Sequence, residues 1–320
     1  MHIRKSILAL CVLFLAASCA ESKKQKPLLK SEKQEGSLVI SLAEQPLLGY
    51  KYETEYPPEG VDSAYQRSGY IHPLRTPKGK ILTRIQPEDH YHHYGIWNPW
   101  THTLYDGDTI DFWNLKKKEG TVRFAEFKEV TDDGYTALHE HVVLKDNKNE
   151  VALNEWQTVK ITPGEDPSTY TVDLTFTYEC ATDKPFLILE YRYAGFGWRA
   201  TQEWNNQNSE ILASNGSTRA EADGSTARWC LVQGALGDDF GGALMLSHPS
   251  NFNHPEPLRI WPVDQYDRGD VFACFCTTKN TDWLFEPGKT YTLNYQLVVF
   301  DGKLDKEKSE HYWQEFAKTE

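Results

Sequence analysis

The sequence predicts an all-β fold, a large antiparallel β-sandwich with a short C-terminal helix. Three observations support this class. About ten short segments after residue 36 are rich in β-branched and aromatic residues, and many alternate polar with apolar side chains. Turn sequences such as TDDGY and EPGKTY separate them. Only the end of the chain places Glu, Lys and apolar residues at clear helical spacing.

The expected strands, in chain order, cover residues 37–42, 120–130, 135–145, 155–162, 169–179, 185–196, 227–236, 242–248, 271–278 and 290–300. A helix is expected over 304–318, and a second, short helix is considered near 201–207. We find neither an internal repeat nor a second linker. The strands are therefore assigned to one sandwich domain spanning residues 37–320.

The N-terminus predicts an exported lipoprotein. A basic start at Arg4 and Lys5 precedes an apolar run that is too short to span a bilayer, which is typical of a signal peptide over residues 1–18. The run ends in LAASC, so Cys19 is the expected lipidation site, and ordinary signal cleavage is the alternative. Residues 19–36 are polar and are expected to form a flexible tether to the membrane.

Composition excludes some kinds of binding partner. The formal net charge is -12, and a surface of that sign repels a phosphate backbone, so no nucleic-acid partner is expected. After the signal no apolar run of about 18 residues occurs, so membrane contact is expected only through the lipid anchor. The sequence does not indicate an oligomeric state.

Four cysteines follow the signal segment, namely Cys180, Cys230, Cys274 and Cys276. An exported chain could oxidise them, and their connectivity cannot be deduced from spacing. No CxxC occurs, so neither a zinc knuckle nor a thioredoxin-like site is indicated. Buried free thiols are the preferred interpretation.

The stretch DHYHHYGIWNPW, residues 89–100, is the main functional candidate. Read as an extended segment, it places His90 and His92 on one side and His93 on the other. Trp97 and Trp100 follow, and indoles suit stacking on sugar rings, so we expect both to bind substrate. His90 and His92 are candidate substrate ligands, or the ligands of a divalent metal ion, the only cofactor considered.

Two further groups of histidines come later. His139 and His141 share a strand face, and because Glu140 interrupts the opposite face we expect the pair to face solvent or a cleft. The loop HPSNFNHP contributes His248, Asn251 and His254 and is expected to close the site opposite residues 89–100.

Several long blocks of the sequence resemble a known family. These are HPLRTPKGKILTRIQPEDHYHHYGIWNPW, DTIDFWN, STARWCLVQG, LSHPSNFNHPEPLRIWP and FEPGKTYTLNYQLVVFDG. In this order they resemble the exported bacterial family named methane oxygenase PmoA, from about Tyr65 to Gly302. The family's His-His-Arg-Gly-Leu-Trp block has Tyr94 in place of arginine here. The later block matches at His248, Pro249, Asn251, His254 and Pro255.

The resemblance implies a supersandwich similar to galactose mutarotase. Such folds bind carbohydrate on a concave face and use histidine and carboxylate pairs as acid and base. We therefore predict acid–base chemistry on a glycan or modified sugar: epimerase, lyase or hydrolase. His93, His248, Glu155 and Glu203 are the catalytic candidates; His90, His92, Trp97, Trp100, Asn251 and His254 are the substrate-binding candidates. A non-catalytic glycan-binding lipoprotein and a His-ligated metal oxidoreductase are the alternatives.

Overall fold

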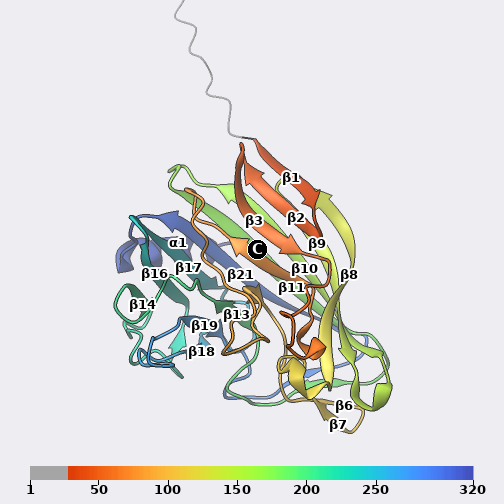
Figure 1. Cartoon of the computed structure of the whole chain (residues 1–320). Helices are drawn as coiled ribbons and strands as arrows, with labels where there is room; N and C mark the ends of the chain where they lie inside the picture. The colour runs from red at the N-terminus through yellow and green to blue at the C-terminus, as the bar shows by residue number, and fades with distance from the viewer. Residues whose placement is uncertain (1–27, 320) are drawn as a thin grey trace, which may run out of the picture.

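The computed structural model describes residues 28–319, and β-strands dominate them (Figure 1). The strands are β1 (Leu29–Gln34), β2 (Ser37–Leu42), β3 (Gln45–Lys51), β4 (Tyr70–Leu74), β5 (Ile96–Trp97), β6 (Thr103–Tyr105), β7 (Asp108–Ile110), β8 (Gly120–Thr131), β9 (Gly134–Val143), β10 (Glu150–Pro163), β11 (Thr169–Cys180), β12 (Phe186–Ile188), β13 (Phe196–Arg199), β14 (Ser209–Ala213), β15 (Thr226–Ala227), β16 (Trp229–Leu236), β17 (Asp239–Ser247), β18 (Glu256–Ile260), β19 (Phe272–Phe275), β20 (Trp283–Phe285) and β21 (Thr290–Asp301). The helix is α1 (Lys306–Phe316), and three short 3₁₀ turns are η1 (Ser63–Tyr65), η2 (Leu115–Lys117) and η3 (Lys145–Asn147).

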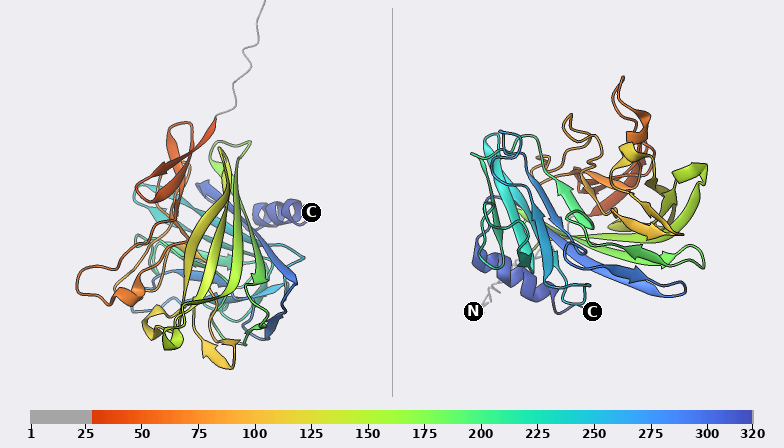
Figure 2. Two further views of the ribbon diagram at one scale, coloured as in Figure 1. Left: turned by 90° about the vertical axis from the view of Figure 1, so that its right-hand side faces the viewer. Right: turned by 90° about the horizontal axis from the view of Figure 1, so that it is seen from below.

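The strands form three antiparallel sheets. A nine-stranded sheet has the order β1-β2-β3-β4-β5-β13-β19-β18-β15, and an eight-stranded sheet has the order β14-β16-β17-β21-β11-β10-β9-β8. A small sheet, β20-β12-β6-β7, lies beside them. The eight-stranded sheet curves around the rest of the chain (Figure 2). The predicted all-β antiparallel class with a short C-terminal helix is therefore confirmed.

Alternation in the sequence explains which face of each long strand is buried. Along β11, buried and half-buried residues alternate for nearly its whole length, because successive side chains point to opposite faces. The inward faces of the two large sheets meet in one core that is unusually aromatic: Trp97, Trp100, Trp198, Trp204 and Trp261 are all fully buried in it. Burying five indoles supplies much of the apolar area that holds the two sheets together.

Helix α1 covers the outer face of the eight-stranded sheet (Figure 2). Asp305 caps its N-terminus, since its side chain accepts a hydrogen bond from the backbone N–H of Lys308 at 2.8 Å. Phe316 joins Trp229, Leu231 and other residues in a small second core between the helix and the sheet. The helix predicted over 304–318 is thus confirmed.

Two sequence predictions about chain organisation are corrected. The flexible tether over residues 19–36 is wrong for its second half, because residues 29–34 form β1 and pair with β2 from Leu29↔Leu42 to Gln34↔Ser37. The helix considered near 201–207 is a series of turns around the buried Trp204. The signal peptide and Cys19 lie outside the described residues.

The four cysteines of the described chain are free thiols, as predicted. Cys230, Cys274 and Cys276 are buried, and Cys180 is partly exposed. Among residues 28–319, no helix has the length and apolar character needed to cross a membrane.

Candidate functional site

Three histidines meet on one wall of a cavity, in the loop before β5. Tight turns shape this loop: the backbone N–H of His90 donates to the carbonyl of Pro87 at 2.8 Å, and that of His93 to the carbonyl of His90 at 2.9 Å. The predicted alternation of an extended segment is therefore wrong, because the turns bring His93 to the same side as His90 and His92. The ring centroids lie 4.6, 4.8 and 5.2 Å apart. One ring nitrogen of each histidine lies within 4.8 Å of the other two.

The backbone holds the ends of this loop together. The N–H of Gln86 donates to the carbonyl of His93 at 2.8 Å, which closes the loop at its base. Gly95 follows with φ of 59°, and a Cβ on it would lie 2.3 Å from the carbonyl oxygen of Ile71. Only glycine allows β5 to start so close to β4. These backbone contacts thus fix the position of the loop that carries the three histidines.

Two of the three imidazoles make no hydrogen bond within residues 28–319. His93 is 1% exposed and its Nδ1 is buried without a partner, and no described group bonds to the ring of His92. The third ring is oriented at both nitrogens: Nδ1 of His90 lies 2.9 Å from the carboxylate of Asp89, and its Nε2 lies 3.3 Å from the hydroxyl of Tyr266. Buried polar atoms are almost always paired, so the unpaired Nδ1 of His93 indicates a missing ligand, and the ring of His92 beside it is free to bind the same one.

Burial keeps two of these rings neutral. It lowers the pKa of His92 to about 3, with a further contribution from the neighbouring His90. Burial also holds the pKa of His93 well below its ordinary value, helped by His92 and Arg199. Neutral imidazoles have a lone pair available for a metal ion or a proton.

A network of ion pairs formed by Asp89, Arg199 and Asp270 contacts His90 through Asp89. Burial by itself would raise the pKa of the Asp89 carboxyl, but hydrogen bonds and charge from His90 and Arg199 outweigh it and hold the pKa well below its usual range. Arg199, at the end of β13, bonds to both oxygens of Asp89 at 2.9 and 3.1 Å and to Asp270 at 3.0 Å. Its guanidinium also lies over the Trp261 ring, 4.5 Å from the centroid. These ion pairs therefore fix the ionised Asp89, and through it the orientation of His90.

The cavity in front of the histidines has a volume of about 390 Å³. Its lining is polar and aromatic: His90, His92, His93, Trp113, Asn114, Tyr191, Arg192, Tyr193, Arg259, Gln265 and Tyr266. A space of this size, with rings on several walls and paired donors between them, fits a small polyhydroxylated molecule. The predicted stretch 89–100 thus contributes one wall of a cavity, through its histidines.

Tyr193 has the most distinctive environment in that lining. Its hydroxyl oxygen accepts a hydrogen bond from Arg259 at 2.9 Å and another from Nε1 of Trp261 at 3.0 Å. Arg259 in turn pairs with Asp223 at 2.8 Å. Within the described chain the O–H of Tyr193 has no acceptor, so it is positioned to donate a proton to, or receive one from, a molecule in the cavity.

The two tryptophans predicted as stacking platforms are instead part of the core. Trp97 is 1% exposed and Trp100 is fully buried. Trp97 packs against His93 from behind, with ring centroids 5.1 Å apart, and so supports the cluster without reaching a ligand. The prediction is corrected because both faces of β5, which carries Trp97, are covered, and Trp100 in the loop after β5 is buried as well. Trp113 and the tyrosines supply the aromatic lining instead.

The loop HPSNFNHP does not close this cavity. The prediction that His248, Asn251 and His254 belong to the same site as residues 89–100 is therefore corrected. His248 lines a separate cavity of about 250 Å³ beside Phe316 of α1. Asn251 is buried and its amide donates to Glu256 at 3.0 Å. Nδ1 of His254 lies 3.2 Å from the hydroxyl of Ser247. His93 and His248 therefore do not line a common cavity as an acid–base pair.

The two predicted carboxylates also lie elsewhere. Glu155 is 2% exposed and accepts hydrogen bonds from Nδ1 of His139 at 2.9 Å and Nε2 of His141 at 3.0 Å. The hydroxyl of Tyr50 donates to the other nitrogen of His139 at 2.6 Å. His139 and His141 thus point into the core, opposite to the prediction. Glu203 is an exposed residue in a turn.

Sequence reasoning missed Tyr193 and Arg259, which line the cavity, and Arg199, which holds Asp89 behind it. One signal was available: Arg199 ends the apolar segment AGFGWRA, and an arginine in a buried strand needs a carboxylate partner. The partners Asp89 and Asp270 lie 110 and 71 residues away in sequence. Only the sheet order brings them together.

Comparison of this chain with known structures and protein families shows the following similarities. Heparan sulfate lyase HepC from Pedobacter heparinus is 9% identical, with a TM-score of 0.36 over 87% of this chain and 35% of the lyase, so this chain spans about a third of its length. A galactose mutarotase related enzyme from Lactobacillus acidophilus is 7% identical, with a TM-score of 0.36 over 87% of this chain and 100% of that enzyme. Among curated proteins, none matches the sequence significantly. Residues 37–314 match the model of DUF6807, a family of unknown function, and the chain belongs to this family.

Proposed function

We propose that this protein is an enzyme that acts on a sugar, or a closely related polyhydroxylated molecule, in the histidine-lined cavity, and that His90, His92 and His93 hold a divalent metal ion there. The observation that carries the proposal is the convergence of three imidazoles on one cavity wall, two of them without a hydrogen-bond partner among residues 28–319. Three protein ligands with an open side are typical of catalytic zinc sites.

The geometry requires a small adjustment to bind metal. Three nitrogens at about 2.1 Å from a tetrahedral ion lie about 3.4 Å apart, whereas the ligand nitrogens here lie within 4.8 Å of one another. Rotation of His92 and His93 would break no hydrogen bond to the described chain. His90 is already oriented through Nδ1 by Asp89, the carboxylate–histidine arrangement that often supports a metal ligand, and its Nε2 would exchange the Tyr266 hydroxyl for the ion.

The rest of the lining suits a hydroxylated substrate. Asn114, Gln265 and the tyrosine hydroxyls offer donors and acceptors to sugar hydroxyls, and the aromatic rings offer faces for C–H groups. A bound divalent ion would polarise a hydroxyl or carbonyl oxygen of the ligand. Tyr193 would hold or deliver the proton, since Arg259 and Trp261 fix its oxygen and its O–H has no acceptor within the described chain.

We further propose that the protein is exported and anchored by lipid at Cys19, as the N-terminal sequence predicts. The resemblance to the family named methane oxygenase PmoA stays a prediction, and so does a mutarotase-like supersandwich. Fractionation of cells that express Cys19→Ser tests the anchor. Loss of membrane association is expected, and unchanged association would contradict it.

The function is tested by metal content and turnover together. Purified protein is stripped with a chelator, reloaded with Zn²⁺, Mn²⁺, Fe²⁺ or Cu²⁺, and incubated with a panel of monosaccharides and disaccharides followed by NMR. We expect one ion per chain and metal-dependent turnover, both lost in His92→Ala and His93→Ala. His311→Ala, on the exposed side of α1, is the matched control and should retain both. Metal-independent turnover, or full metal retention by the two variants, would contradict the metal site; sugar binding without turnover would indicate a glycan-binding protein instead.

A further inference from the structure

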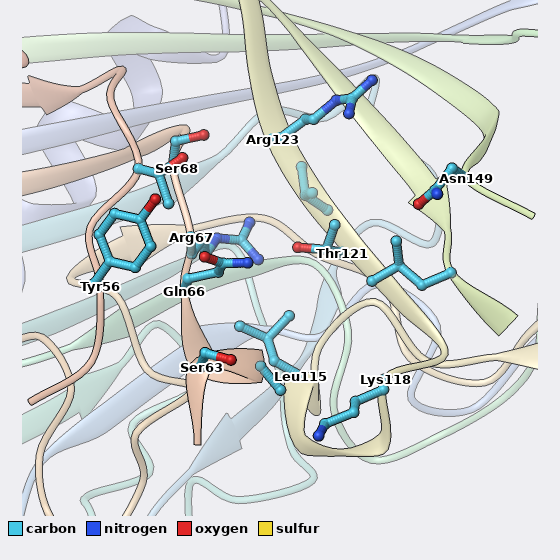
Figure 3. A pocket seen from close by; sticks show the side chains of 14 residues that line it. Tyr56, Ser63, Gln66, Arg67, Ser68, Leu115, Lys118, Thr121, Arg123 and Asn149 are labelled. Atoms are coloured by element: carbon cyan, nitrogen blue, oxygen red, sulfur yellow. The ribbon is translucent and has the colours of Figure 1, made fainter. Parts of the chain in front are cut away.

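A second cavity of about 620 Å³ borders the same segment as the first: Asn114 lines the histidine-lined cavity and Leu115 lines the second. We propose that this second cavity binds an oxyanion, the carboxylate or sulfate group of a ligand, through the guanidinium of Arg67 (Figure 3). The proposal concerns different residues from the metal site and does not depend on it.

Arg67 is a buried cation without a hydrogen-bond partner. It is 3% exposed, and no residue of the range 28–319 accepts a hydrogen bond from its guanidinium or lies within ion-pair distance of it. Figure 3 shows the guanidinium beside the amide of Gln66, with the hydroxyl of Thr121 across from it in the cavity. Arg67 is thus a nearly buried cation in the lining of this cavity.

Such a group is costly unless something binds it. Nε of Arg67 is buried without a hydrogen-bond partner, and a buried donor left unpaired costs on the order of 1–3 kcal/mol. Burial lowers the pKa of Arg67 to about 10, so the group is still charged at neutral pH. Its planar fork matches the two oxygens of a carboxylate or sulfate. An oxyanion would satisfy both the charge and the donors.

The nearby carboxylates do not fill this role. Glu155 acts on Arg67 through its charge, but it lies beyond ion-pair distance and accepts hydrogen bonds from His139 and His141. The other two cations of the cavity already have partners. Lys118 pairs with Asp62 at 3.1 Å, and Arg123 pairs with Glu140 at 2.7 Å. Arg67 is thus the one lining cation of the described chain that lacks an acidic partner.

The surrounding residues suit an anion that is attached to a hydroxylated body. Gln66, Thr121 and Asn149 present neutral donors and acceptors, and Ser63 adds a hydroxyl near the rim. These groups pair with hydroxyls and add no negative charge. The chemistry that the lining fits best is an acidic sugar, with a simple oxyanion as the other source of the same group.

The test is a set of calorimetric titrations on chelator-treated protein, repeated on His92→Ala, so that failure of the metal site and failure of this site are distinguishable. The probes are D-glucuronate, D-glucose, acetate and inorganic sulfate. Wild-type protein should bind glucuronate, and Arg67→Met should weaken that binding about 10- to 100-fold, the value of a charge-assisted hydrogen bond. The affinity of Arg67→Lys for glucuronate should lie between those of the wild type and Arg67→Met, because lysine keeps the positive charge but lacks the planar pair of N–H donors.

Two comparisons show whether the binding is local to Arg67 and which kind of anion is bound. Lys128→Met removes an exposed cation from β8 and should leave every affinity unchanged, which separates a local site from general surface charge. Tighter binding of glucuronate than of acetate or sulfate identifies an acidic sugar, and equal binding identifies a simple oxyanion. If Arg67→Met does not fold by circular dichroism, Gln66→Ala and Thr121→Val replace it and should each weaken glucuronate binding. Absence of anion binding by the wild type, or anion affinities that none of these variants lowers, would overturn the proposal.

Discussion

Replacing Glu155 with alanine is expected to destabilise the protein strongly, although the sequence suggested a catalytic role for this residue. The carboxylate is 2% exposed and accepts one hydrogen bond from each of His139 and His141, at 2.9 and 3.0 Å. Burial by itself would raise its pKa, but the two histidines outweigh this effect and lower the pKa to about 2. Glu155 is therefore ionised in the folded protein and is a structural group.

The magnitude follows from what the substitution leaves behind. Two buried imidazole N–H groups lose their acceptor, and each costs about 1–3 kcal/mol when unpaired. The buried cation Arg67 also loses the negative charge that supports it. Removing one member of a buried charged network costs about 3–5 kcal/mol in other proteins, and we expect the same range here. For a chain of this size the loss corresponds to a fall in Tm of about 5–8 °C.

Urea unfolding followed by tryptophan fluorescence measures this loss, because several tryptophans are fully buried. Glu155→Gln should cost roughly half as much, since it keeps the volume and one acceptor oxygen. Glu129→Ala removes an exposed carboxylate from β8 and should change the free energy of unfolding by no more than about 0.5 kcal/mol. If Glu155→Ala were as mild as Glu129→Ala, the assignment of Glu155 to a buried structural network would be refuted.

Four further outcomes are expected. Asp89→Asn should weaken metal binding at the histidine cluster about 10- to 100-fold, measured by competition with a chromogenic chelator, and should also lower the free energy of unfolding because Arg199 loses one of its charged partners; an unchanged metal affinity would argue against its orienting role. Tyr193→Phe should lower kcat about 10²- to 10⁴-fold and leave KM nearly unchanged if the hydroxyl transfers a proton, whereas a change in KM alone would indicate binding. Burial lowers the pKa of His72 to about 4, so the unfolded chain takes up this proton first as pH falls below about 6.5, and the free energy of unfolding should drop by about 3 kcal/mol between pH 6.5 and 4; a pH slope identical in His72→Asn would disprove the assignment. Trp97→Ala should cost about 3–5 kcal/mol of stability, and an effect confined to ligand affinity would restore its role as a stacking platform.

The strands were predictable because their signal is local. In β11 the alternation of polar and apolar residues follows directly from the geometry of a strand, and the observed bounds lie within a residue of those expected. Helix α1 was equally visible, with Asp305 as its cap. The same pattern did not say which face is inside. On β9 the face with His139 and His141 is buried, because Glu155 on the neighbouring strand accepts both N–H groups, and that partner is not apparent from β9 alone.

The candidate site was predictable only in part. The histidines of residues 89–100 stood out by composition, and they do line a cavity. Their convergence depends on turns at Pro87 and His90, which an extended reading misses. The opposite wall depends on contacts between distant segments, such as Arg259 with Tyr193. His248 and Glu203 had similar local composition, but the sheet order places them outside this cavity. Composition thus identified candidate segments, and topology decided which of them meet.

The position of a bound ion shows whether His90, His92 and His93 form a metal site that faces a substrate cavity. Crystals of the protein grown with Zn²⁺ are measured on both sides of the zinc absorption edge. We expect one strong anomalous peak about 2.0–2.1 Å from a ring nitrogen of each of the three histidines, with its open side towards Tyr193. A peak bound by other residues, or no peak at the cluster under saturating Zn²⁺, would contradict the metal site.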